Sequence, residues 1–269
     1  MSGFYHSLNS FTIYPLKSAS GIHLKSAKAG AEGFFLDRRW ILIDPVGKFV
    51  SQRVAPRLAL ITQTLQKEKP FVSLGSETRE LPELNDSHPS IIVSIWGDVV
   101  EAVLAGDFWD SWFSRFLDKP VRLAYMKAKG DRIKIFDISP GYAPVSFADG
   151  YPYLILGTAS VDALNQRLNQ PIPVNRFRPN IVINTAEPHE EDKWDRFRIG
   201  NVIFKCVKLC PRCVVTTIDQ KTALRSAEPL KTLASYRKNG NEIYFAVNAI
   251  VENEGMVHLE DEIEILSWK

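Results

Sequence analysis

Short apolar runs, separated by turn residues, dominate the first hundred residues of this chain and constrain its fold more than any other feature. The runs are rich in β-branched residues and are bounded by turn signals such as Asp44-Pro45-Val46-Gly47. Val93-Ser94-Ile95 turns through Trp96-Gly97-Asp98 into Val99 to Val103, which predicts a hairpin. Strands are expected at Leu8 to Tyr14, Gly21 to Ala27, Trp40 to Ile43, Ala59 to Gln63, Phe71 to Leu74, Ile91 to Ile95 and Val99 to Leu104. Many short strands with few helices predict a barrel or a strongly curved sheet.

Helical periodicity appears in only three places. Asp107 to Leu117 has apolar residues on one face, which predicts a helix packed on a sheet. A second helix is expected from Ala159 to Leu168, and a third after Pro229. Further strands are expected at Ile181 to Asn184, Asn201 to Val207, Val214 to Ile218, Tyr244 to Val251 and Glu262 to Leu266. The polar stretch Lys127 to Gly150 is either a domain boundary or a loop over a site. The fold class is therefore mixed and β-rich, α+β.

Composition excludes several classes of protein. With 269 residues the chain can bury one large core or two ordinary ones, and 45% apolar with 24% charged residues is typical of a soluble globular protein. A net charge of +2 without a basic run argues against nucleic-acid binding, and no apolar run has the length of a membrane span. The N-terminus lacks the pattern of a secretory signal, and three unevenly spaced cysteines do not make a disulfide framework. We expect a cytoplasmic protein.

Two of the three cysteines flank an arginine in Cys210-Pro211-Arg212-Cys213. A zinc site needs about four ligands, yet there is no second cysteine pair and the five histidines are scattered. A thioredoxin-like motif should open a helix, whereas Val214 to Ile218 predicts a strand. Two small buried thiols remain possible. The other alternative is a thiolate ligand for a metal carried by an anionic organic cofactor, because a guanidinium beside a thiol favours the thiolate.

Cationic side chains recur at the ends of predicted elements. Lys17 follows the first strand and its turn, and Arg38 precedes the strand at Trp40. Arg176-Phe177-Arg178 precedes another strand, and an extended backbone there would direct both arginines to one side. Each cation alone is usually a solvated surface charge. Binding groups nevertheless concentrate at such positions, so these residues are candidates for holding an anion.

Two further segments carry weaker signals. The helix start at Thr158 and Ser160 offers free backbone N–H groups and hydroxyls, which suit an anion, although an ordinary helix cap by Thr158 is the more common arrangement. Asp192 and Trp194 lie in an acidic stretch that could form a polar clamp. We favour an exposed acidic turn for that stretch.

The order of these motifs resembles the MOSC family, named for the molybdenum cofactor sulfurase C-terminal domain. The resemblance is to the two-domain type, typified by the mitochondrial amidoxime-reducing component and its bacterial relatives, and it covers essentially the whole chain. The first part matches through Tyr14-Pro15-Leu16-Lys17-Ser18, Gly33-Phe34-Phe35-Leu36-Asp37-Arg38-Arg39-Trp40 and Ser51-Gln52-Arg53. The second part matches through Thr158-Ala159-Ser160, Leu164-Asn165, Arg176-Phe177-Arg178-Pro179-Asn180, Glu191-Asp192 with Trp194, Cys210-Pro211-Arg212-Cys213, Thr216-Thr217-Ile218-Asp219, Pro229-Leu230, Leu233 and Tyr236-Arg237.

The resemblance implies a domain plan and a cofactor. Residues 1–120 would form a MOSC N-terminal β-barrel-like domain, and residues 121–269 a MOSC β-barrel domain with peripheral helices. The molybdenum cofactor, a pterin dithiolene (molybdopterin), would have its metal ligated by Cys213, which is thereby also the catalytic residue. The residues implied to hold the rest of the cofactor are Lys17, Ser18, Arg38, Thr158, Ser160, Arg176, Arg178, Asn180 and Arg212.

The implied activity is the reduction of small N-hydroxylated compounds, such as hydroxylaminopurines and amidoximes, with electrons from a separate flavin or iron–sulfur protein. Neither a nucleic-acid nor a membrane partner is expected. The alternative is a cofactor carrier or sulfur-transfer module whose Cys213 bears a persulfide. MOSC domains are also associated with pyridoxal-phosphate-dependent sulfurases, but the chain has no aminotransferase-like domain for that cofactor. It departs from the family pattern at Ala19, Phe245-Ala246 and Glu260-Asp261.

Overall fold

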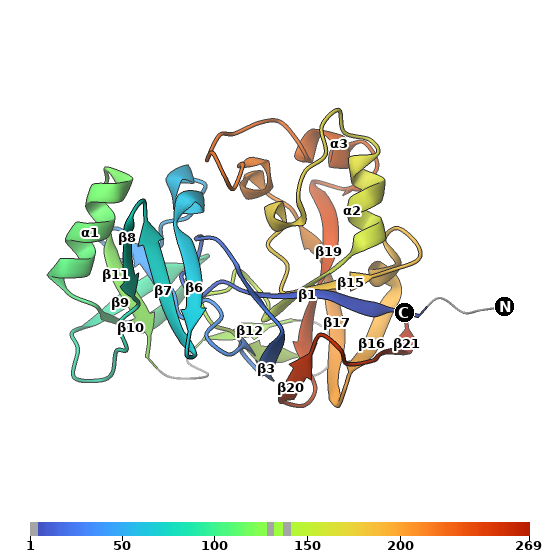
Figure 1. Cartoon of the computed structure of the whole chain (residues 1–269), viewed down its shortest axis with the longest axis horizontal. Coiled ribbons are helices and arrows are strands. Elements are labelled where there is room, and N and C mark those ends of the chain that lie inside the picture. The colour runs from blue at the N-terminus through green and yellow to red at the C-terminus, as the bar shows by residue number, and fades with distance from the viewer. Residues whose placement is uncertain (1–4, 128–131, 137–140) are drawn as a thin grey trace.

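The computed structural model describes residues 5–127, 132–136 and 141–269. The chain forms two β-rich lobes that lie side by side (Figure 1). The first lobe carries helix α1 (Asp107–Leu117), and the second carries α2 (Thr158–Asn165) and α3 (Leu230–Ala234). Strands far outnumber helices over the described residues, which confirms the mixed, β-rich α+β class.

The first lobe is built from two small antiparallel sheets. One has the strand order β5-β11-β10-β9 and the other the order β6-β7-β8. Their bounds are β5 (Trp40–Ile43), β6 (Thr62–Gln66), β7 (Lys69–Leu74), β8 (Glu77–Glu80), β9 (Ser90–Ile95), β10 (Asp98–Leu104) and β11 (Arg122–Met126). The predicted hairpin is confirmed: β9 and β10 pair in register, and Trp96 and Gly97 both adopt the positive φ angles, 52° and 87°, of a tight two-residue turn.

Helix α1 closes one side of the first lobe. Its range is the predicted one, and Trp112, Phe113 and Leu117 are buried in a cluster with Leu58 and Val72. Asp118 follows in the left-handed conformation and ends the helix. The helical face therefore belongs to the hydrophobic core, as its periodicity predicted.

The second lobe is organised around one large mixed sheet. Its strand order is β2-β1-β15-β14-β19-β17-β16-β21, with β18 paired to β19. The bounds are β1 (Ser7–Ile13), β2 (Ile22–Leu24), β14 (Tyr153–Gly157), β15 (Ile181–Asn184), β16 (Trp194–Ile199), β17 (Val202–Pro211), β18 (Lys238–Asn239), β19 (Glu242–Val251) and β21 (Ile263–Trp268). Phe11, Tyr153, Phe197 and Phe204 pack in its core.

The first strands of the chain belong to the sheets of the second lobe. β1 pairs antiparallel with β15, and β3 (Ser26–Gly30) lies between β20 (Gly255–His258) and β4 (Gly33–Phe34). The chain therefore passes from the second lobe into the first between β4 and β5. The backbone around Leu16 and Lys17 pairs with Trp40 at the start of β5, so this segment lies at the junction of the lobes. A division of the chain at residue 120 stays a prediction.

A single-turn helix lies where the sequence pattern after the cysteine motif predicted a strand. Val214–Thr217 forms the 3-10 helix η4, so the strand predicted at Val214 to Ile218 is wrong. The hydroxyls of Thr216 and Thr217 donate to the carbonyls of Cys213 and Val214, at 2.9 and 2.8 Å. These local hydrogen bonds take the place of the inter-strand hydrogen bonds that a β-strand would make. The other single-turn helices are η1 (Pro56–Leu60), η2 (Val174–Arg176) and η3 (Glu190–Lys193).

The polar stretch from residue 127 to 150 partly lies outside the described residues. Its described part contains β12 (Ile133–Ile135) paired with β13 (Tyr142–Pro144) and then a buried run from Val145 to Ala148. Figure 1 places β12 at the junction of the lobes. Among the described residues, none of the helices has the length and apolar character needed to cross a bilayer.

Candidate functional site

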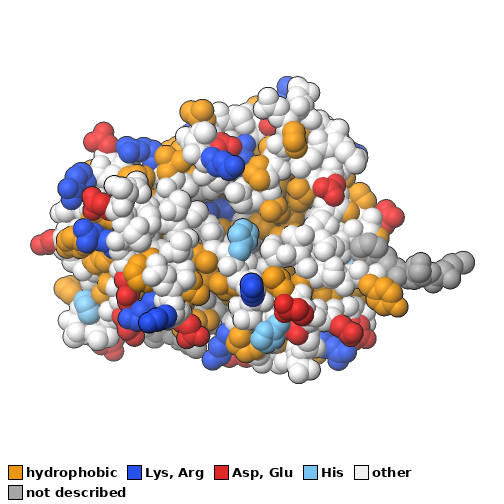
Figure 2. Space-filling model, in the orientation of Figure 1, with side chains coloured by type: hydrophobic (Ala, Val, Ile, Leu, Met, Phe, Trp, Pro, Cys, Tyr) orange, Lys and Arg blue, Asp and Glu red, His pale blue; other side chains and the backbone are white. Residues whose placement is uncertain are grey.

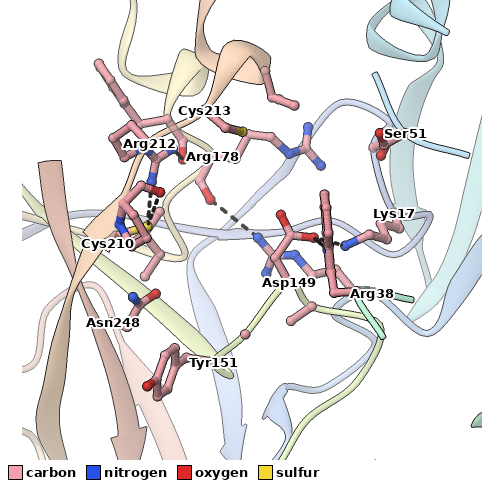
Figure 3. Close-up of a pocket in the computed structure, with 18 of the residues that line it drawn as sticks. Lys17, Arg38, Ser51, Asp149, Tyr151, Arg178, Cys210, Arg212, Cys213 and Asn248 are labelled. Atoms are coloured by element: carbon pink, nitrogen blue, oxygen red, sulfur yellow. Dashed lines mark hydrogen bonds and ion pairs between the residues drawn. The ribbon is translucent and has the colours of Figure 1, made fainter. Parts of the chain in front are cut away.

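A cavity of about 350 Å³ lies at the junction of the two lobes. In Figure 2, Lys or Arg side-chain atoms are visible in the hollow between the lobes, and Figure 3 shows the side chains that face the cavity. Residues from both lobes line it: Lys17, Ser18, Arg38, Ser51, Gln52, Arg53, Trp96, Ala148, Asp149, Gly150, Tyr151, Leu154, Phe177, Arg178, Asn180, Lys208, Cys210, Pro211, Arg212, Cys213, Val215 and Asn248. A volume of this size suits a small organic ligand.

Lys17 is held at the cavity wall by the turn that follows β1. Its backbone N–H donates to the carbonyl of Trp40 at 2.8 Å, which ties this turn to β5. Its side chain is only 8% exposed; the ammonium donates to the carbonyl of Phe147 at 2.7 Å and forms an ion pair with Asp149. Burial lowers the pKa of Lys17 to about 8, and the carboxylate of Asp149 opposes that shift. The cavity therefore contains an ammonium with little access to water.

Arg38 and Asp37 form a second, more deeply buried ion pair. Asp37 is 1% exposed, accepts a hydrogen bond from the backbone N–H of Tyr14 at 2.7 Å and pairs with Arg38. Asn180 joins them: its Nδ2 donates to Asp37 and its Oδ1 accepts from Arg38, both at 3.1 Å. The pair is thus part of a fully bonded network that fixes the Arg38 guanidinium at the cavity.

Arg178 approaches from the second lobe and faces the same aromatic ring as Arg38. The guanidinium carbons of Arg38 and Arg178 lie 4.7 and 4.1 Å from the ring centroid of Tyr14. Arg178 also donates to the carbonyl of Ala19 at 2.6 Å, and its burial lowers its pKa to about 10. Burial raises the pKa of Tyr14 to about 12, with the two guanidinium groups opposing, so the ring remains neutral.

The predicted extended course of Arg176-Phe177-Arg178 is wrong. Arg176 ends η2, Phe177 has helical angles and Arg178 has a φ of 56°, so the two arginines diverge. Arg176 is 6% exposed, its Nε and Nη1 have no hydrogen-bond partner among the described residues, and it does not line the cavity. A helical turn followed by a left-handed residue removes the alternation that the prediction assumed.

The cysteine motif lies where β17 ends at the cavity. Arg212 donates to the sulfur of Cys210 at 2.9 Å and to the carbonyl of Phe177 at 2.9 Å, while its Nε is buried without a partner among the described residues. Cys210 and Cys213 both line the cavity as free thiols. Burial raises the pKa of Cys210, and the adjacent Arg212 opposes this. Figure 3 places Arg212 between the two cysteines.

Cys206 differs from the other two thiols. It lies in the core of the second lobe with no exposed surface, and burial raises its pKa to about 12. It therefore stays a neutral thiol and has no access to the cavity. Across the described ranges, His, Cys, Asp and Glu side chains do not gather in groups of three or more that could hold a metal ion. A metal held by a cysteine here needs further ligands from outside the protein.

The start of α2 lies apart from the cavity lining. Glu191, which has no exposed surface, accepts hydrogen bonds from the backbone N–H of Gly157 at 3.1 Å and from the hydroxyl of Ser160 at 2.8 Å. Burial raises the pKa of Glu191, and these hydrogen bonds oppose the shift. Ser160 also accepts from the backbone N–H of His189 at 2.8 Å. The protein's own carboxylate therefore occupies the position that the sequence suggested for an external anion.

The acidic stretch around Asp192 is buried, and the expected exposed turn is wrong. Asp192 pairs with Arg237, while Trp194 has no exposed surface. Thr158 accepts a long hydrogen bond, 3.4 Å, from the backbone N–H of Thr185. Together with Arg176, Thr158 and Ser160 are the predicted cofactor-binding residues that do not line the cavity. The predicted residues that do line it are Lys17, Ser18, Arg38, Arg178, Asn180, Arg212 and Cys213.

Several cavity residues were missed as functional candidates. Ser51 and Gln52 entered only as part of a family match, yet Gln52 donates to the carbonyl of Ser18 at 2.7 Å. Trp96 lies at the tip of the β9–β10 hairpin and donates to Asp149 at 3.0 Å. Asp149 itself lies in the polar stretch that was expected to be either a domain boundary or a loop over a site. A hairpin tip and a lone acid in a loop carry no chemical signal in sequence alone.

Two protein-family models match this chain, one in each half. The MOSC N-terminal beta barrel domain model matches residues 5–120, and the MOSC domain model matches residues 143–264. Mitochondrial amidoxime-reducing component 1 of Homo sapiens is 32% identical, over 94% of this chain and 81% of that protein. Mitochondrial amidoxime reducing component 2 of Bos taurus is 35% identical, over 84% and 70%. A molybdenum cofactor sulfurase of Oryza sativa subsp. japonica is 30% identical, over 97% of this chain but 34% of that protein.

Proposed function

The chain belongs to the MOSC family in its two-domain form, and we propose that it is a molybdenum-cofactor-dependent reductase of small N-hydroxylated compounds. One observation carries the proposal: Cys213 and Arg212 line the same cavity as the cations Lys17, Arg38 and Arg178. A thiol that can ligate a thiophilic metal thus faces groups that can hold an anionic organic cofactor. The amidoxime-reducing relatives support the choice of substrate class.

The residues present fit this cofactor. Phosphate is recognised by guanidinium and ammonium groups, and the cavity has both. The ammonium belongs to Lys17 in the turn after β1, and the guanidinium groups belong to Arg38 and Arg178. The buried Nε of Arg212 has no partner among the residues that the structure describes, so a hydrogen-bond donor remains for a ligand. Cys213 would hold the molybdenum, and the remaining ligands would come from the cofactor's dithiolene. Lys17, Ser18, Arg38, Arg178 and Asn180 would hold its phosphate and pterin.

When bound, the cofactor supplies the two-electron reduction in which an N–OH group, two protons and two electrons give N–H and water. The chain's own residues would bind the cofactor and orient it. Arg38 and Arg178 are fixed in direction by Asp37, Asn180 and the carbonyl of Ala19. Electrons come from a separate flavin or iron–sulfur protein, as proposed from the family resemblance.

The test is a pair of cysteine substitutions in protein expressed with molybdate. Cys213→Ser should lose bound molybdenum, measured by elemental analysis, and lose reduction of an aromatic amidoxime by a reduced viologen donor by more than a hundredfold. Cys210→Ser is the matched control, because Cys210 lines the same cavity and lies two residues before Arg212. This variant should keep most of the bound molybdenum and most of the activity. Wild-type rates in Cys213→Ser would contradict the proposal.

A second candidate is a carrier or sulfur-transfer module without turnover. The relation to a molybdenum cofactor sulfurase favours it; this chain corresponds to 34% of that protein. In this case Cys213 would carry a persulfide. Sulfane sulfur released by cyanide from wild type but not from Cys213→Ser, with no amidoxime reduction by either, would decide for the carrier.

A further inference from the structure

Two carboxylates neutralise the cations of the cavity, and their surroundings differ. Asp37 is 1% exposed and is bonded by Tyr14, Asn180 and Arg38, so it is a fixed part of the wall. The side chain of Asp149 is 65% exposed. A single oxygen, Oδ1, accepts from both Lys17 and the indole N–H of Trp96. Over the described residues, the Asp149 carboxylate is thus held by Lys17 and Trp96 alone.

The backbone beneath Asp149 is firmly anchored. Arg132, only 2% exposed, donates to the carbonyls of Ser146 at 3.0 Å, of Ala148, and of Asp149 at 3.3 Å. Arg132 is itself paired with Asp98 at 2.7 Å. The carboxylate of Asp149 can therefore leave Lys17 by rotation of its side chain toward the open cavity, while the main chain stays in place.

Lys17 requires a negative partner, because a buried ammonium without one is costly. Its remaining bond, to the carbonyl of Phe147, is neutral. Figure 3 shows the Asp149 carboxylate between Lys17 and Arg38, where an anionic group bound to these cations would also lie. Two anions at this position would repel each other, so a phosphate and the Asp149 carboxylate compete for the same ammonium.

We propose that Asp149 is an exchangeable counter-ion: it neutralises Lys17 while the cavity lacks an anionic ligand and yields that ammonium to a phosphate monoester when one binds. Asp149 is a positioning residue that keeps Lys17 directed into the cavity. The proposal rests on the proposed function only for the identity of the natural ligand. The competition itself requires only a phosphate group.

The test uses glycerol phosphate as the probe and NMR titration of cofactor-free protein. Asp149→Asn removes the charge but keeps an oxygen that can accept from Trp96, and we expect it to bind the probe about five- to tenfold more tightly than wild type. Asp118→Asn is the matched control: it makes the same change in net charge at an exposed, left-handed helix end, where Asn is well tolerated, and should change the affinity less than twofold.

A second readout follows the exchange directly. The indole N–H signal of Trp96, assigned by its loss in Trp96→Phe, should shift when glycerol phosphate binds to wild type, because its acceptor moves away. Binding to Asp149→Asn that is absent, weaker or unchanged would overturn the proposal, as would equal tightening in Asp118→Asn or an unmoved Trp96 signal at saturation. Absence of molybdenum or turnover would overturn the proposed function and leave this result standing.

Discussion

The cavity between the lobes and the start of α2 both gather groups that attract anions, but they satisfy those groups in opposite ways. At α2, Glu191 accepts from Gly157 and Ser160 and has no exposed surface. In the cavity, Lys17 is paired with Asp149, whose side chain is 65% exposed. A site for an external ligand is distinguished less by its attracting groups than by whether their internal partner can be displaced.

The largest expected effect is on stability and comes from the start of α2, the sealed region, where Glu191 is fully buried. Glu191→Ala would leave the Gly157 N–H and the Ser160 hydroxyl without their buried acceptor, so the free energy of unfolding should fall by about 3 kcal/mol. Urea unfolding measures this. Glu191→Gln keeps the volume and one acceptor oxygen and should lose less. Folded Glu191→Ala that binds glycerol phosphate tenfold more weakly would show that the two regions are not separate.

The next effect concerns the cavity between the lobes, the open region, where the partner of Lys17 is exposed. Arg178→Ala should weaken glycerol phosphate binding more than tenfold, because a charge-assisted contact to a phosphate is lost in a poorly hydrated cavity. Arg178→Lys keeps a positive charge but not the planar guanidinium, so its affinity for glycerol phosphate should lie between those of wild type and Arg178→Ala. Thr158→Ala is the comparison variant at the helix start and should bind like wild type. If Thr158→Ala weakens binding as strongly as Arg178→Ala, the separation of the two regions is wrong.

Sequence reasoning reached the cavity through cations at the ends of predicted elements. Lys17, Arg38 and Arg178 were selected because each follows or precedes a strand at a turn, and all three line the cavity. That success depends on the crossing of β1 into the second lobe, since only this topology brings Lys17 beside residues more than a hundred positions away. The family resemblance supplied the pairing of these cations with Cys213, whose role as a ligand stays a prediction.

The misses have physical causes that sequence patterns do not contain. Arg176 does not line the cavity because it ends the helical turn η2 and is followed by the left-handed residue Arg178. The Ser160 hydroxyl donates its hydrogen bond to Glu191, which is 31 residues away in sequence, and is therefore not free for an external anion. Asp149 was overlooked because a single acid in a polar loop has no distinguishing neighbours in sequence; its partner Lys17 is 132 positions away in the chain. Long-range pairing of charges is what the sequence could not reveal.

The smallest effect is a pH dependence of binding that should be found only in the open region. Lys17 is faced by Asp149, Arg38 and Arg132 and by the ring of Phe49, and its burial lowers its pKa to about 8. Glycerol phosphate is a dianion throughout the range from pH 7.5 to 9.5. Wild-type affinity should therefore fall about fivefold over that range as Lys17 loses its proton, whereas Lys17→Arg, whose guanidinium stays charged, should show a flat profile.

The sign of the stability change separates lost binding from lost folding. The unfolded chain keeps the Lys17 proton to about pH 10, while the folded protein releases it near pH 8, so between these values the unfolded state binds more protons. The contribution of Lys17 to the free energy of unfolding thus rises with pH while phosphate affinity falls. A parallel fall of both in wild type, or the same loss of affinity in Lys17→Arg, would mean that Lys17 is not the group that holds the phosphate.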